Sequence, residues 1–257
     1  MPTPVTLSSD FGRYYPAAMR GVLAKRGIDE IHDVTHELPA HDIRESAFWL
    51  HTLLPFFPRA VHCIVIDPGV GGERDVVILR AGGHALVGPD NGVCWPAAST
   101  LADTETVESF VFEHVDPESH TFHGRDVFAP VAAAIASVGI DRIEELPTVK
   151  PAESPKQHSL PTPRTGDDWI ETEIIATDRF GNAITGASGS LLDIVGEEAV
   201  AVDGDPVPVG RRYGAVEIGD RLVTVGSHGH IELAANQAAG TDAFGVDVGD
   251  TVRISRV

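Results

Sequence analysis

The stretch AVHCIVIDPGVGGER, residues 60–74, decides the fold of this chain of 257 residues. Its first half is an almost unbroken apolar run, which is typical of a parallel strand that is covered on both faces. Its second half places Asp67 and Arg74 around several glycines, which predicts a tight loop at the carboxyl end of that strand. Because α/β enzymes carry their chemistry in such loops, we expect a functional site here.

Strand-like runs alternate with helix-like segments on both sides of this stretch. The expected strands are residues 3–9, 28–34, 60–66, 75–80, 84–87 and 107–112, and the expected helices are residues 16–26, 42–57 and 126–138. Gly82 and Gly83 separate two of these strands and predict a hairpin. Alternating strands and helices are typical of parallel sheets, so residues 1–148 are predicted to form an α/β N-terminal domain with a mainly parallel sheet flanked by helices.

The composition changes after residue 148. Prolines spaced among polar residues predict a linker over residues 149–167. Residues 168–257 contain short alternating segments separated by glycine and aspartate, which are typical of β-structure. The sequence therefore predicts a small all-β C-terminal domain in the form of a barrel.

Composition and charge limit the partners and the location that we expect. No apolar stretch approaches the roughly 20 residues of a membrane span, and the formal net charge of −19 argues against nucleic acid and anionic membranes as partners. No signal peptide is evident and the chain has only two cysteines, so we expect a cytoplasmic protein. Because lysine occurs only three times, the acidic excess predicts a halophilic protein from a salty cytoplasm.

Four residues of the first half are candidates for a site. The glycine-rich loop lets Asp67 and Arg74 meet, where the arginine either keeps the carboxylate ionised and oriented or only braces the loop. His123 precedes an expected helix start, where an imidazole either exchanges a proton near neutral pH or has a structural role. Asp10 follows the first strand and can accept hydrogen bonds from two ribose hydroxyls or hold a turn.

Several common ligand motifs are not found. The chain has no G-x-G-x-x-G segment and no P-loop, so dinucleotide or nucleoside triphosphate binding of those types is not indicated. His32, His36 and Glu37 have a spacing that can chelate a metal on a helix, but their strand-like surroundings set them too far apart. We therefore expect no metal site.

Two segments of the second half carry candidate binding residues. Asp178, Phe180 and Asn182 join a carboxylate, an aromatic ring and an amide within one turn. Asparagine can pair with the edge of adenine and phenylalanine can stack on it, although Gly-Asn is also typical of an ordinary β-turn. Ser227 lies in a polar loop whose hydroxyl can hold a carboxylate, and Asn236 ends the strand that follows.

Taken in order, these segments resemble the S-adenosyl-L-methionine hydroxide adenosyltransferases, which are relatives of the fluorinase and chlorinase enzymes. The motifs are SDFG at residues 9–12, DPGVG with its arginine at 67–74, GPDNG at 88–92, TFHGRD at 121–126, DRFGN at 178–182, and S-x-G at 227–229 with Asn236 downstream. Six motifs in one order, spread over both predicted domains, are more specific than any single motif.

The resemblance implies an N-terminal α/β domain, a C-terminal β-barrel and a homotrimer that binds S-adenosylmethionine between the N-terminal domain of one subunit and the C-terminal domain of the next. By motif, Asp67, Arg74 and His123 would handle water. The substrate would be bound by Asp10 at the ribose, Asn182 at the adenine, Asp178 at the methionine ammonium and Ser227 at its carboxylate, with Phe11, Phe180 and Asn236 as further contacts. In the halogenating relatives an arginine usually follows the serine, whereas this chain has His228.

Two differences from the fluorinase indicate the branch of the family to which the resemblance points. The fluorinase has Tyr-Ser where this chain has His123 and Gly124, and this chain lacks the extra fluorinase loop. The resemblance thus implies water as the nucleophile: attack at C5′ would give adenosine and L-methionine, with S-adenosylmethionine as substrate and no cofactor. The alternatives are a halide-dependent adenosyltransferase and a non-catalytic sensor of S-adenosylmethionine or adenosine.

Overall fold

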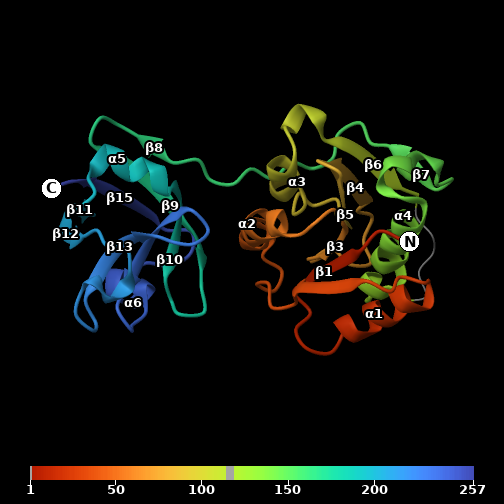
Figure 1. Cartoon of the computed structure of the whole chain (residues 1–257), viewed down its shortest axis with the longest axis horizontal. Coiled ribbons are helices and arrows are strands. Elements are labelled where there is room, and N and C mark those ends of the chain that lie inside the picture. The colour runs from red at the N-terminus through yellow and green to blue at the C-terminus, as the bar shows by residue number, and fades with distance from the viewer. Residues whose placement is uncertain (1, 114–118) are drawn as a thin grey trace. The chain divides into compact units, whose positions relative to one another are not determined.

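The computed structural model describes residues 2–113 and 119–257. The chain divides into two compact units, of which the first ends at Ser159 and the second is Leu160–Val257. Figure 1 shows that the first unit combines a sheet with helices, whereas strands dominate the second. The boundary between the units falls inside the proline-containing segment 149–167, although both ends of that segment pair with a sheet.

The first unit contains a seven-stranded sheet with the order β2-β1-β3-β5-β4-β6-β7. Its strands are β1 (Val5–Ser9), β2 (Ile31–Thr35), β3 (Val61–Val65), β4 (Val76–Ala81), β5 (His84–Pro89), β6 (Glu108–Phe112) and β7 (Val149–Pro151). Strands β2, β1, β3 and β5 pair in parallel, but β4, β6 and β7 pair antiparallel. The sheet is therefore mixed, and the expected mainly parallel pairing is confirmed only for these four strands. The predicted hairpin from β4 to β5 reverses the chain, and the later strands add antiparallel at the edge beyond β4.

Helices cover both faces of this sheet. They are α1 (Pro16–Lys25), α2 (Ile43–Leu53), α3 (Trp95–Leu101) and α4 (Ala129–Val138). Helices α1 and α4 share one apolar cluster with the sheet, and α2 and α3 share the other. Asp42, the first residue of the expected helix 42–57, caps α2 by accepting hydrogen bonds from the backbone N–H groups of Arg44 and Glu45.

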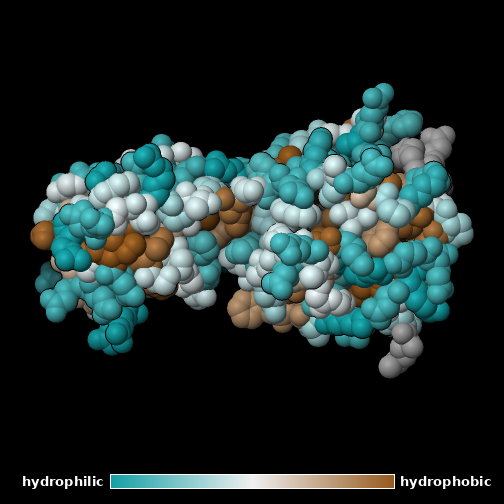
Figure 2. Space-filling view, turned by 90° about the horizontal axis from the view of Figure 1, so that it is seen from above, coloured by the Kyte–Doolittle hydropathy of each residue, from teal (hydrophilic) through white to brown (hydrophobic). Residues whose placement is uncertain are grey.

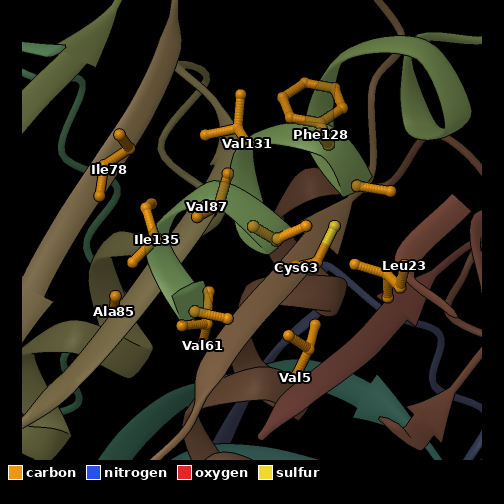
Figure 3. Close-up of a cluster of buried hydrophobic side chains, with 14 of the residues drawn as sticks. Val5, Leu23, Val61, Cys63, Ile78, Ala85, Val87, Phe128, Val131 and Ile135 are labelled. Atoms are coloured by element: carbon orange, nitrogen blue, oxygen red, sulfur yellow. The ribbon is translucent and has the colours of Figure 1, made fainter. Parts of the chain in front are cut away.

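The residues of β3 explain why the apolar run is continuous. Val61 and Cys63 belong to the cluster under α1 and α4, whereas Ile64 belongs to the cluster under α2 and α3. Figure 3 shows Val131 and Ile135 of α4 lying over Val61 and its neighbours in the sheet. Since successive side chains point to opposite faces and both faces are covered, every position of the strand is buried.

The second unit is an all-β structure that is nearly closed into a barrel. Its strands are β8 (Arg164–Thr165), β9 (Trp169–Thr177), β10 (Ala183–Ser188), β11 (Ala199–Val202), β12 (Asp205–Pro208), β13 (Arg221–Val225), β14 (His230–Ala235) and β15 (Thr251–Arg256). The order is β12-β11-β15-β9-β10-β14-β13, with β8 on β9. A bridge between Val209 and Val223 joins the segment after β12 to β13 and so nearly closes the sheet, as the sequence predicts.

Short helical segments complete the fold. They are α5 (Leu192–Val195), α6 (Gly240–Phe244), the π-helical turn Gly124–Phe128 and 3-10 turns at Leu54–Phe56, Thr104–Thr106, Ile140–Glu145, Gly189–Leu191 and Tyr213–Ala215. None of the helices in the described part of the chain has the length and apolarity that crossing a bilayer demands. Figure 2 shows a mostly hydrophilic surface with smaller, separate hydrophobic areas.

Candidate active site

A pocket of about 320 Å³ in the first unit contains three of the four candidate residues of the N-terminal half, Asp10, Asp67 and His123. Its lining consists of Asp10, Phe11, Tyr15, Ala40, His41, Val65, Asp67, Val70, Thr121, His123 and Gly124. Asp10 follows β1, Asp67 follows β3 by two residues, and His123 precedes the turn into α4. Because β1 and β3 are parallel neighbours, their carboxyl ends meet at one edge of the sheet, and residues far apart in the sequence share one pocket.

Asp67 and Arg74 form a buried, two-pronged ion pair. Arg74 Nε donates to Asp67 Oδ1 at 2.8 Å, and Arg74 Nη2 donates to Oδ2. The side chains are only 4% and 10% exposed, respectively. The loop between them turns at Gly71, whose φ is +79° and whose absent side chain leaves room for the carbonyl of His120. The arrangement holds the carboxylate in one orientation.

Arg74 also determines the proton position on His123. Arg74 Nη2 lies 2.8 Å from His123 Nδ1. A guanidinium only donates hydrogen bonds, so Nδ1 accepts and the proton of the neutral ring is on Nε2. Phe128 supports the guanidinium from one side, with the ring centre 5.0 Å from the central carbon of the guanidinium. The three candidate catalytic residues thus form one connected cluster in which His123 offers an N–H and Asp67 offers acceptor oxygens.

The turn that follows His123 packs against the ring of Phe11. A side chain at Gly124 would place its Cβ 2.8 Å from Phe11 and 3.2 Å from the sulfur of Met19. The ring of Phe11 in turn contacts Tyr15 and Phe122 edge to face, with ring centres 6.1 and 5.6 Å apart. Gly124 therefore allows Phe11 to reach the pocket, and the lack of a side chain there has a packing reason.

Two further carboxylates of this region, Asp10 and Asp126, differ in how many hydrogen bonds they accept within the protein. The Asp10 carboxylate accepts one hydrogen bond, at 2.9 Å from the backbone N–H of His41, and retains acceptor positions for a ligand. Asp126 binds Arg125 and the backbone N–H of Ser119, and the hydrogen bonds from Arg125 lower the pKa of Asp126. Asp126 therefore braces the segment before α4.

A second pocket, of about 600 Å³, lies in the barrel unit. Its lining consists of Phe180, Asn182, Tyr213, Ala235, Asn236, Gln237, Ala238 and Ala239. The ring of Phe180 is 72% exposed, Asn182 is buried, and Asn236 Nδ2 donates to the carbonyl of Val216 at 2.8 Å. A mostly apolar lining with a few amide groups suits a flat heteroaromatic ring.

Asp178 and Ser227 lie outside the described lining of both pockets. Asp178 Oδ1 accepts the backbone N–H groups of Phe180 and Asn182, each at 2.9 Å, and Oδ2 accepts Asn182 Nδ2 at 2.9 Å. Its carboxylate thus holds the turn that presents Phe180 and Asn182 to the second pocket. Ser227 is exposed in the turn between β13 and β14, and His228 beside it has its Nε2 3.2 Å from Glu232 Oε2.

Sequence reasoning did not identify two residues that organise the second pocket. Tyr213 lines it, and the buried Glu232 accepts the hydroxyl of Tyr213 at 2.7 Å. The only sequence indication for Glu232 is a carboxylate in an otherwise apolar strand, and Tyr213 lies in a turn without a motif. Their importance emerges from contacts between segments that are distant in the sequence.

The protein thus combines an α/β unit, which has an Asp–Arg–His cluster at its strand ends, with a barrel unit that has a pocket lined by aromatic and amide groups. The model of the S-adenosyl-L-methionine hydroxide adenosyltransferase N-terminal domain matches residues 5–146, and the model of the C-terminal domain of the same proteins matches residues 172–253. The chain belongs to the S-adenosyl-L-methionine hydroxide adenosyltransferase family.

Individual relatives match over almost their whole length. The protein named (R)-S-adenosyl-L-methionine hydrolase from Salinispora tropica is 38% identical over 99% of this chain and 98% of its own. The protein of the same name from Thermus thermophilus is 36% identical over 98% and 99%. A solved structure of an uncharacterized conserved protein from Thermotoga maritima has a TM-score of 0.83 at 28% identity and covers 98% of this chain and all of the other.

Proposed function

We propose that this protein is an enzyme that hydrolyses S-adenosyl-L-methionine to adenosine and L-methionine. The observation that carries the proposal is the match, over nearly the full length, to relatives named as hydrolases of this substrate. The connected cluster of Asp67, Arg74 and His123 supports it, because a protein that only binds its ligand has no need of an oriented carboxylate and imidazole.

The chemistry is a substitution at C5′ of the substrate. The oxygen of water forms a bond to C5′, the bond from C5′ to the positive sulfur breaks, and its electron pair stays on sulfur, so that methionine leaves as a neutral thioether. The water loses one proton in the process. Such a leaving group needs no general acid, and the proposed reaction needs no metal or cofactor. The protein has to align water with the breaking bond and to reduce its hydration.

The cluster suits this task. Asp67, held by Arg74, can accept a hydrogen bond from the attacking water and then its proton. His123, with its proton on Nε2, can donate a hydrogen bond to the water oxygen and hold it in place. Val65, Val70 and the ring of Phe11 line the same pocket and limit the number of other waters around the nucleophile.

The roles of the binding residues remain part of the proposal. Asp10 has acceptor positions for the two ribose hydroxyls, and Phe180, Asn182 and Asn236 line a pocket that suits adenine. We also propose that Asp178 binds the ammonium group of the methionine part of the substrate and that Ser227 binds its carboxylate. Asp178 also holds its own turn, so any contact with the ammonium uses the lone pairs that the turn leaves over.

The expected homotrimer is also a proposal. The pocket of the first unit contains the groups for water and ribose, and the pocket of the second contains the groups for the base. A substrate that bridges one pocket of each kind, from neighbouring subunits, would be fully bound. The expected cytoplasmic location is also a proposal, which is supported by Cys63 and Cys94 because both are free and buried.

The deciding experiment incubates the purified protein with S-adenosyl-L-methionine in chloride and in a non-halide salt, with products separated by chromatography and identified by mass spectrometry. Adenosine and methionine in both salts are expected. A 5′-chloro product that appears only with chloride would assign the protein to the halide-dependent branch. Retained ligand without turnover would make it a sensor.

A further inference from the structure

A chain of hydrogen bonds runs from the interior of the barrel to the second pocket. It begins at Glu232, a residue of β14 that is 2% exposed. The hydroxyl of Tyr213 donates to Glu232 Oε1 at 2.7 Å, and Asn182 Nδ2 donates to the same hydroxyl at 3.3 Å. The second hydrogen of the Asn182 amide is donated to Asp178 Oδ2 at 2.9 Å.

The direction of each bond follows from the chemistry of the groups. Tyr213 has a single hydroxyl proton, and the hydroxyl donates it in the hydrogen bond to the carboxylate of Glu232. The tyrosine oxygen can therefore only accept a hydrogen bond from Asn182. Burial and the nearby Glu232 raise the pKa of Tyr213, so the hydroxyl keeps its proton. Asp178 likewise accepts. The amide nitrogen of Asn182 must therefore face both partners, and the oxygen Oδ1 is the part that remains for a ligand.

The other oxygen of Glu232 is engaged as well. The backbone N–H of His230 donates to His228 Nδ1 at 3.2 Å, which places the imidazole proton on Nε2. That nitrogen lies 3.2 Å from Glu232 Oε2 and donates to it. A Cβ at Gly226 would lie 2.3 Å from His228 Nε2 and 2.4 Å from Glu232 Oε2, so the absence of a side chain there makes room for the pair.

We propose that Glu232 and Tyr213 are positioning residues that make the second pocket select a 6-aminopurine over a 6-oxopurine, by holding Asn182 Oδ1 toward the base. The inference rests on the proposed function, in which Asn182 contacts the base. The exocyclic amino group of adenine is a donor and matches Oδ1. The 6-oxygen of hypoxanthine is an acceptor, so it would leave the buried amide oxygen without a partner.

The test compares adenosine with inosine, which differ at that position, as ligands of the full-length protein. Titration calorimetry gives the ratio of the two dissociation constants for wild type, Tyr213→Phe and Glu232→Gln. We expect wild type to bind adenosine at least about tenfold more tightly, as for other mismatched buried hydrogen bonds. In both variants the ratio should fall severalfold, because the amide of Asn182 is no longer held in one orientation.

Thr185→Val is the matched control. Its hydroxyl donates to the carbonyl of Ile231, next to Glu232, at 2.9 Å and lies outside the chain of bonds. This variant also loses one buried hydroxyl, but its ligand ratio should equal that of wild type. With S-adenosyl-L-methionine, Tyr213→Phe should raise KM and leave kcat nearly unchanged, since the base is remote from C5′.

The outcomes separate the two proposals. An unchanged ratio in Tyr213→Phe overturns the inference, and so does an equal fall in Thr185→Val. A wild type that hydrolyses S-adenosyl-L-methionine but binds inosine as tightly as adenosine overturns the inference and leaves the proposed function standing. A wild type that neither turns over the substrate nor binds adenosine overturns both. Tyr213→Phe keeps the test available if Glu232→Gln does not fold, because it removes only a hydroxyl.

Discussion

Arg74 Nη2 lies 2.8 Å from His123 Nδ1, so the proton of the neutral imidazole is on Nε2. The same nitrogen of Arg74 donates its other hydrogen to Asp67. One arginine therefore orients both the acceptor and the donor that face the proposed water, and it ties the loop after β3 to the segment before α4.

Removal of either partner of Arg74 should impair turnover and spare binding. We expect Asp67→Ala and His123→Ala each to lower kcat by about 10²-fold or more, the usual contribution of a positioned acid or base. KM should change little, because neither residue is proposed to contact the base. Asp141→Ala is the control, since it breaks an exposed pair with Arg59 and should retain wild-type kcat. Full turnover in both cluster variants would show that the cluster is not catalytic.

Gly124 should tolerate no side chain. Gly124→Ser places a Cβ 2.8 Å from Phe11, so the ring has to leave its position and we expect activity to fall roughly tenfold or more, a cost typical of overpacking. Gly21→Ala is the matched control, because it lies in α1 with no neighbour within 4 Å of the added Cβ. Steady-state kinetics should show wild-type activity for this variant. Equal activity in Gly124→Ser would mean that the contact with Phe11 is unimportant.

The buried His62 should make the first unit sensitive to acid. Burial, with a smaller contribution from His84, lowers the pKa of His62 from 6.5 to about 3. Between pH 6.5 and 3, His62 therefore binds a proton in the unfolded chain but not in the folded chain. As a result, the free energy of unfolding falls as the pH drops from about 6.5 toward 3. The slope for one proton is about 1.4 kcal/mol per pH unit.

Urea titrations at pH 7, 6 and 5 measure this slope. Relative to wild type, His62→Gln should lose less stability on acidification, because the carboxylates that titrate in the same range are common to both chains. The side chain of His62 also bonds Thr6 and His84, so the absolute stability of the variant is not the readout. Parallel pH profiles of the two proteins would contradict the assignment to His62.

Mixed oligomers test whether subunits share sites. Asp67→Ala removes a group of the first pocket and Asn182→Ala a group of the second. If each substrate bridges pockets of neighbouring subunits, unfolding and refolding the two impaired variants together should give more activity than either variant has alone. Light scattering should give the mass of a trimer. No gain on mixing, or a mass that corresponds to one chain, would refute the shared site.

Salt should stabilise the protein. With a net charge of −19, the folded chain repels itself, and salt screens this repulsion over about 10 Å at 0.1 M and about 3 Å at 1 M. We expect Tm to rise steadily as potassium acetate increases from 0.05 to about 2 M, the range in which that screening develops. A Tm and an activity that are both unaffected in very dilute salt would argue against a halophilic protein.

Much of the molecule could be predicted from local patterns. The run at residues 60–66 predicts a buried strand because two covered faces require apolar residues at every position, and Asp42 predicts a helix start because its carboxylate satisfies free N–H groups. The antiparallel pairing of β4 with β5 follows from the hairpin that Gly82 and Gly83 predict. The pairing direction of β6 and β7 could not be predicted from local patterns, since apolar alternation is the same in parallel and antiparallel strands. Helix α3 was also not predicted, because it is short and no polar side chain caps its N-terminus.

The sequence by itself determined the two kinds of domain and, through six ordered motifs, membership of the family, because apolar periodicity and glycine-rich turns act over a few residues. Only the tertiary structure decided which atoms are available to a ligand. The proton on His123 depends on Arg74, which is 49 residues earlier, and the orientation of Asn182 depends on Tyr213, which is 31 residues later. Such directions arise when distant donors and acceptors are buried together and each must find a partner.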